Sequence, residues 1–165
     1  MSTDAKTSVT TQVYEVYIKA PAQAVWDAIT TQEWTAKYGY RGKMEYDLRP
    51  GGAFRAHAAS GMEAFGMPAI LIDGEVIEAT PPTKLVQTYR MLFNEHTKAE
   101  GFTRVTWEIE QNSAGFTRLT VTHELQGAPG MAAMVAGKFS EQGSGGWSWI
   151  LSDLKSLIET GSTLA

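Results

Sequence analysis

Cysteine is absent from the 165-residue sequence, and so are long apolar segments. Without cysteine the chain has no disulfide bond, no thiol nucleophile and no thiolate metal ligand. No apolar run approaches the ~20 residues that a membrane-spanning helix needs. The opening residues 1–12 are polar and contain no signal-peptide apolar stretch. We therefore expect a cytoplasmic protein with no membrane partner.

Clusters of basic residues are missing as well. Lys and Arg number 14 against 18 Asp and Glu, which gives a net charge of −4. Binding to nucleic acid or to an anionic membrane surface needs a concentrated positive patch, so we expect neither partner. With 43% hydrophobic residues the chain can bury a core. Its length suits one domain, which we place at 13–160, between a frayed N-terminal segment 1–12 and a C-terminal tail 161–165.

Alternation of apolar and polar residues predicts a series of β-strands. The strands are expected at 13–18, 44–48, 54–58, 69–79, 84–92, 103–110 and 117–125. Apolar spacing of three and four residues predicts a helix that starts at Pro21, a short helical turn at 32–38 and a final helix at 147–160. The segments 60–68 and 94–101 are expected to be loops, and 126–146 a loose connection. One antiparallel sheet with helices on one face is an α+β fold, and a curved sheet around the last helix leaves room for a cavity.

Several short motifs in this order resemble the START-like or SRPBCC superfamily, and within it the branch related to the heat shock protein 90 ATPase activator homologue. The motifs are Ala20-Pro21 with Val25-Trp26, the turn Arg49–Gly52, Pro81-Pro82 followed by Leu85, the strand Thr117–His123, and Gly146-Trp147. The likeness extends from Val13 to Glu159. It implies a helix-grip fold, in which a curved antiparallel β-sheet wraps around a long C-terminal α-helix and encloses a hydrophobic cavity.

The resemblance leaves the function open, because the superfamily includes lipid and hormone carriers, polyketide aromatase/cyclases and co-chaperone domains. We expect the cavity to bind a small, mostly hydrophobic molecule, aromatic or polyketide-like, without a cofactor and without catalysis. One alternative is a cyclase- or hydrolase-type enzyme that uses His123 as acid or base, with Tyr89 or Glu15. Another is a protein-interaction or co-chaperone-like module. Relatives include monomers and dimers, so a homodimer stays open.

Residues with aromatic rings or polar tips on the predicted inward faces are the candidate ligand-binding residues. They are Tyr38, Tyr46, Phe54, Tyr89, Trp107, His123, Trp147 and Leu151. Methionines at 62, 67, 131 and 134 flank the expected entrance, where flexible thioethers adapt to varied apolar shapes. Each of these side chains could equally be ordinary core packing.

His123 is the most informative titratable residue, because it alternates with Leu119, Val121 and Leu125 on an apolar strand face. Such a histidine is either an acid–base group facing the cavity or a core residue with satisfied hydrogen bonds. The remaining histidines, His57 and His96, show no ligand spacing, so we predict no metal site. Glu15 could face either side of the sheet.

Overall fold

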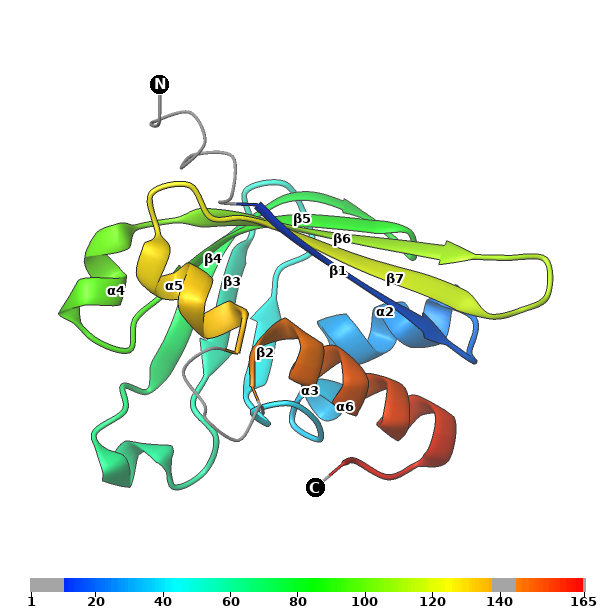
Figure 1. Ribbon diagram of the computed structural model, residues 1–165, viewed down its shortest axis with the longest axis horizontal. Coiled ribbons are helices and arrows are strands. Elements are labelled where there is room, and N and C mark those ends of the chain that lie inside the picture. Colours follow the sequence, from blue (N-terminus) through cyan, green and yellow to red (C-terminus); the bar gives the residue numbers. More distant parts are fainter. Residues whose placement is uncertain (1–10, 138–144, 165) are drawn as a thin grey trace.

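The computed structural model describes residues 11–137 and 145–164, which form a seven-stranded antiparallel sheet and several helices (Figure 1). The strands are β1 (Thr11–Ile18), β2 (Lys43–Tyr46), β3 (Ala53–His57), β4 (Ile70–Thr80), β5 (Lys84–Met91), β6 (Thr103–Gln111) and β7 (Thr117–Glu124). The helices are α2 (Ala22–Thr30), α3 (Gln32–Thr35), η1 (Met62–Phe65), α4 (Glu95–Glu100), α5 (Pro129–Val135) and α6 (Gly146–Thr160).

Strand order in the sheet is β1-β7-β6-β5-β4-β3-β2, so β5 lies in the middle. Strands β2 to β7 form a meander, and β1 closes onto the last strand with Thr11 opposite Glu124 and Ile18 opposite Thr117. Figure 1 shows α2, α3 and α6 on the same side of the sheet. The helix-grip α+β fold expected from the sequence is therefore confirmed.

The core lies between the concave face of the sheet and the helices. Inward strand residues such as Leu85, Val105 and Leu119 are fully buried, and α6 packs Leu154 against them. Full burial of one such side chain contributes roughly 1.5–3 kcal/mol. Helix α6 ends at Gly161, whose φ of 81° is the left-handed conformation that glycine adopts readily at a helix end.

Three helical segments were not expected from the sequence. The segment 94–101, predicted to be a polar loop, contains α4. Asn94 caps the start of this helix by accepting a hydrogen bond from the Thr97 N–H at 2.9 Å. The predicted loose connection 126–146 contains α5, whose first residue is Pro129, and its residues 138–144 lie outside the described part of the chain. The predicted loop 60–68 likewise includes η1. Strand β1 starts at Thr11, two residues earlier than expected, while residues 1–10 lie outside the description.

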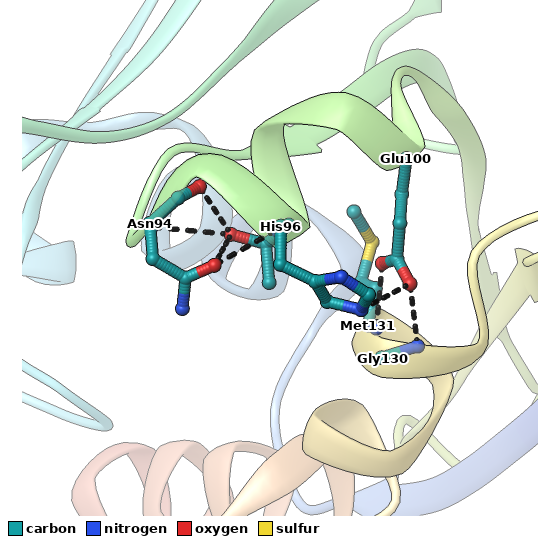
Figure 2. Close-up of polar contacts among 6 residues, drawn as sticks. Asn94, His96, Glu100, Gly130 and Met131 are labelled. Atoms are coloured by element: carbon teal, nitrogen blue, oxygen red, sulfur yellow. Dashed lines mark hydrogen bonds and ion pairs between the residues drawn. The ribbon is translucent and has the colours of Figure 1, made fainter.

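A buried carboxylate joins α4 to α5 (Figure 2). Glu100 accepts hydrogen bonds from the backbone N–H groups of Gly130 at 2.7 Å and Met131 at 3.0 Å, in the first turn of α5. His96 Nε2 lies 3.5 Å from the same carboxylate. These charge-assisted bonds fix α5 in place, and α5 in turn supplies side chains to the cavity described below. None of the helices in the described ranges has the length and apolarity to cross a membrane.

Candidate functional site

A cavity of about 250 Å³ lies between the sheet and α6. The sheet contributes Tyr46, Phe54, Tyr89 and Trp107 to its lining, and α6 contributes Trp147 and Ile150. Met62, Met67 and Met134 also line the cavity, whereas Met131 is fully buried against Thr103. An apolar cavity of ~150 Å³ already accommodates benzene, so this one has room for a larger ring system.

The aromatic rings of the wall form a continuous series. Tyr46 and Phe54 are stacked with centroids 4.8 Å apart, and Phe54 and Tyr89 with centroids 6.0 Å apart. Tyr89 then meets Trp147 at 6.1 Å, and Trp147 meets Trp107 edge to face at 5.3 Å. Ring pairs at these separations attract one another beyond simple area burial, so the wall is held in shape without a ligand.

The loop 39–42 lines the cavity and is tied to α6. Asp153, which is buried on α6, accepts a hydrogen bond from the Gly39 N–H at 2.8 Å. Tyr40 Oη accepts one from the Gly146 N–H at 2.9 Å. Tyr38 lines the cavity and donates to the Ala28 carbonyl at 2.9 Å. Burial, together with the nearby charge of Asp153, raises the pKa of Tyr38 and keeps this phenol neutral.

His123 is fully buried behind this wall, in contact with the rings of Tyr89 and Trp147. Trp147 Nε1 donates to His123 Nδ1 at 3.0 Å. Because an indole N–H only donates, Nδ1 is the acceptor nitrogen and the proton of the neutral ring sits on Nε2. Nε2 then donates to Thr103 Oγ1 at 2.8 Å, and the Thr103 hydroxyl donates to the Tyr89 carbonyl at 2.7 Å. Burial lowers the pKa of His123 to about 3, so the imidazole is neutral at physiological pH.

The hydrogen bonds of His123 argue against the alternative in which it acts as an acid or base with Tyr89 or Glu15. Both ring nitrogens of His123 are occupied by protein groups, and His123 does not contribute to the cavity surface. Glu15 is half-exposed on the opposite face of the sheet, with its carboxylate 3.9 Å from Arg118. Tyr89 lines the cavity, and burial raises the pKa of its hydroxyl. The geometry gives His123 a structural hydrogen-bonding role and places no acid–base pair with Glu15 in the cavity.

Six of the eight residues predicted to bind ligand lie on the cavity surface, namely Tyr38, Tyr46, Phe54, Tyr89, Trp107 and Trp147. The other two, His123 and Leu151, are buried without reaching it.

Gln87 is a polar residue of the site that sequence reasoning overlooked. Its Oε1 accepts hydrogen bonds from Tyr46 Oη and from Trp107 Nε1, both at 2.9 Å. The available signal was its position between Leu85 and Tyr89 on alternating inward positions of β5.

The histidines outside the core pair with carboxylates. His57 Nε2 lies 2.9 Å from Glu45 Oε1 at the partly exposed edge of the sheet, and His96 contacts Glu100. The described residues contain no group of three or more His, Cys, Asp or Glu side chains that could hold a metal ion.

Comparison with protein families gives one match to most of the chain. The family described as activator of Hsp90 ATPase homolog 1-like protein matches residues 19–159. A comparison with curated proteins finds no match.

Comparison with solved structures gives many matches at low identity. CalU16 from Micromonospora echinospora is 18% identical, with a TM-score of 0.65 over 93% of this chain and 77% of its own. DynU16, from the dynemicin biosynthetic locus, is 22% identical with a TM-score of 0.65, and the match covers 93% of this chain but only 49% of DynU16. The Aha1 dimer from Colwellia psychrerythraea is 17% identical, with a TM-score of 0.64 over 92% of this chain and 97% of its own. At these identities the likeness establishes a shared fold.

Proposed function

Since the chain belongs to the activator of Hsp90 ATPase homolog 1-like family, we propose that it binds a ligand in the cavity of this fold. The ligand is a small, mostly hydrophobic molecule with an aromatic or polyketide-like ring system, bound between the sheet and α6. The observation that carries the proposal is the cavity of about 250 Å³ with its series of aromatic rings. Flat rings of a ligand would stack on Phe54, Tyr89 and Trp147 in the manner in which these side chains already pack on one another.

The buried state of the wall supports binding rather than mere packing. Phe54, Tyr89 and Trp147 are each less than a tenth exposed, yet they border unfilled space. Protein interiors are normally close-packed, and unfilled space beside apolar atoms forfeits dispersion contacts. A flat apolar ligand would regain those contacts and would be removed from water at the same time.

A titration with fluorene, a flat three-ring hydrocarbon, tests the proposal. Trp107 and Trp147 lie in the cavity wall, so their fluorescence reports occupancy. Ala56 is buried and lines the cavity, so Ala56→Leu places three further carbons in the space that the ligand would occupy. We expect this variant to bind fluorene at least roughly tenfold more weakly than the wild type, because an overfilled core resists a further guest.

The matched control is Ala99→Leu, the same change at an exposed position of α4, which should bind like the wild type. Native mass spectrometry of the freshly purified protein provides a second test, through any small molecule that co-purifies. Absence of fluorene binding to the wild type, or unchanged binding in Ala56→Leu, would contradict the proposal.

We further propose that the chain forms a homodimer through β1. The similar Colwellia protein is described as a dimer. In the described part of this chain β1 is a terminal strand of the sheet, and its outward side chains Val13 and Tyr17 are 62% and 50% exposed. Tyr17 also contacts the partly exposed Phe116. Large exposed apolar groups beside an open strand edge favour pairing with another chain.

Light scattering coupled to size exclusion should give twice the mass of one chain. Tyr17→Ser should shift the equilibrium towards monomer, whereas Phe65→Ser, at an 88% exposed position on η1, should not. A monomeric wild type over a wide concentration range would contradict the dimer.

A further inference from the structure

The side-chain amide of Gln87 has hydrogen-bond partners on its oxygen but none on its nitrogen. Oε1 accepts from both Tyr46 Oη and Trp107 Nε1. Nε2 is buried and makes no hydrogen bond within the described structure. Gln87 itself is only 1% exposed. The core beside the cavity therefore contains a glutamine whose two N–H donors find no acceptor among the described residues.

The assignment of oxygen and nitrogen in this amide follows from its partners. The indole N–H of Trp107 can only donate, so the amide atom that faces it at 2.9 Å has to be the acceptor, Oε1. A flipped amide would bring two donors face to face. The unpartnered atom is consequently the nitrogen, and what it lacks is an acceptor.

The position of the amide ties it to the cavity. Gln87 lies on β5, the central strand, and both partners of its oxygen are side chains that line the cavity. Gln87 itself does not border the cavity, so its amide lies behind the side chains of Tyr46 and Trp107. Tyr46 is the last residue of β2, a short terminal strand of the sheet, and is only half-buried. A ligand in the cavity reaches the amide only when the Tyr46 ring moves aside.

Buried donors without a partner are rare in native proteins and destabilise the folded state. A group that supplies the missing acceptor is therefore bound more tightly than an apolar group of the same shape.

We propose that Gln87 Nε2 is the polar recognition point of the cavity, and that it selects flat apolar ligands bearing a carbonyl oxygen, of the ketone or quinone type, over hydrocarbons of the same shape. The inference rests on the proposed ligand-binding function and specifies its ligand class. The carbonyl accepts from Gln87, while the rings of the ligand lie against the aromatic wall.

A matched pair of probes separates the carbonyl from the rings. Fluorene and 9-fluorenone share one three-ring framework and differ by a carbonyl oxygen. The measured quantity is the ratio of their dissociation constants, obtained by quenching of tryptophan fluorescence. In Gln87→Met, an unbranched side chain of similar length without N–H donors, the preference for 9-fluorenone should fall about tenfold, equivalent to about 1.4 kcal/mol. The different solubilities of the two probes cancel when the ratio is compared between proteins.

The matched control is Gln126→Met, the same change at an exposed residue, which should leave the ratio at its wild-type value. A ratio that stays the same in Gln87→Met overturns the inference while the cavity function stands. If neither probe binds the wild type, the proposed function fails, and this inference fails with it.

Infrared spectroscopy of the wild type keeps the inference testable even if Gln87→Met does not fold. The carbonyl stretch of bound 9-fluorenone should lie at a lower frequency than in an alkane solvent, because a hydrogen bond weakens the C=O bond. An unshifted band overturns the inference.

Discussion

Acidification from pH 7 to pH 5 should lower the free energy of unfolding by about 2 kcal/mol through His123 alone. The histidine has an ordinary pKa of 6.5 in the unfolded chain and a pKa of about 3 in the folded one. Between these values the unfolded chain binds a proton that the folded chain does not bind. The stability that the neutral His123 contributes is therefore present above pH 6.5 and is lost as the pH falls towards 3. A loss of this size is a large part of the ~5–15 kcal/mol that stabilises a typical domain.

The hydrogen bonds of His123, like its burial, disfavour the protonated imidazole in the folded protein. A proton added to Nδ1 would point at the Trp147 N–H, which now donates to that nitrogen at 3.0 Å. Two donors would then face each other in the core, and the charge would have no counter-ion among the residues that contact the ring, Thr103, Tyr89 and Trp147.

The other two histidines lie outside the core. His57 and His96 each pair with a carboxylate at a partly exposed position, where ion pairs contribute little to stability. Glu45 and Glu159 have pKa values lowered from 4.5 by neighbouring donors, so the stability they contribute is lost only below pH 5. Comparison of the wild type with His123→Gln over the window from pH 7 to 5 therefore isolates the contribution of His123.

Urea denaturation at pH 7, 6 and 5, followed by far-ultraviolet circular dichroism, measures the effect. His123→Gln removes the titrating group and is expected to show a nearly flat profile over this window, from a lower starting stability. His96→Gln, a change at an exposed histidine, should keep the wild-type slope. A flat profile in the wild type, or an equal slope in His123→Gln, would refute the reasoning.

Three further substitutions test the packing around the site. Glu100→Gln removes the charge that holds the first turn of α5 and should cost about 1 kcal/mol; hydrogen exchange at the Gly130 amide should become faster. Gly74→Ala would place a Cβ against the Thr88 carbonyl oxygen, so thermal unfolding should show a loss of roughly 3 kcal/mol. An unchanged midpoint would contradict the β4–β5 register. Leu154→Ala opens a hole beneath α6 and should cost about 2–5 kcal/mol in urea denaturation.

The sheet could be predicted from the sequence because several of its strands, such as β6 and β7, alternate between a buried and an exposed face. Helix α4 could not, because five of its six residues are polar and the segment has no apolar periodicity. The helix is held by contacts that periodicity does not report, namely the Asn94 cap and the bonds from Glu100 to α5. The local signals of a helix start were Asn94 followed three residues later by Thr97, and the acidic Glu95 in the first turn.

Alternation assigns a residue to a face of the sheet but not to a depth beneath it. Tyr89 and His123 both point inward, yet Tyr89 reaches the cavity whereas His123 stops behind it. The difference arises from Trp147, which approaches from α6 and covers the imidazole. A contact such as that between Trp147 and His123, which are far apart in the sequence, depends on how α6 lies across the sheet. No short sequence pattern encodes this placement.

His123 and Gln87 are the two large buried polar side chains of the concave face, and they differ in one respect that separates stability from recognition. Every polar atom of His123 has a protein partner, so its replacement should lower stability without changing the preference between 9-fluorenone and fluorene. Gln87 keeps one nitrogen without a partner, so its replacement should change that preference. Measuring both quantities in both variants distinguishes the two roles. A change of ligand preference in His123→Gln equal to that in Gln87→Met would show that the cavity responds to general loosening of the core, and that neither residue has the separate role argued from its hydrogen bonds.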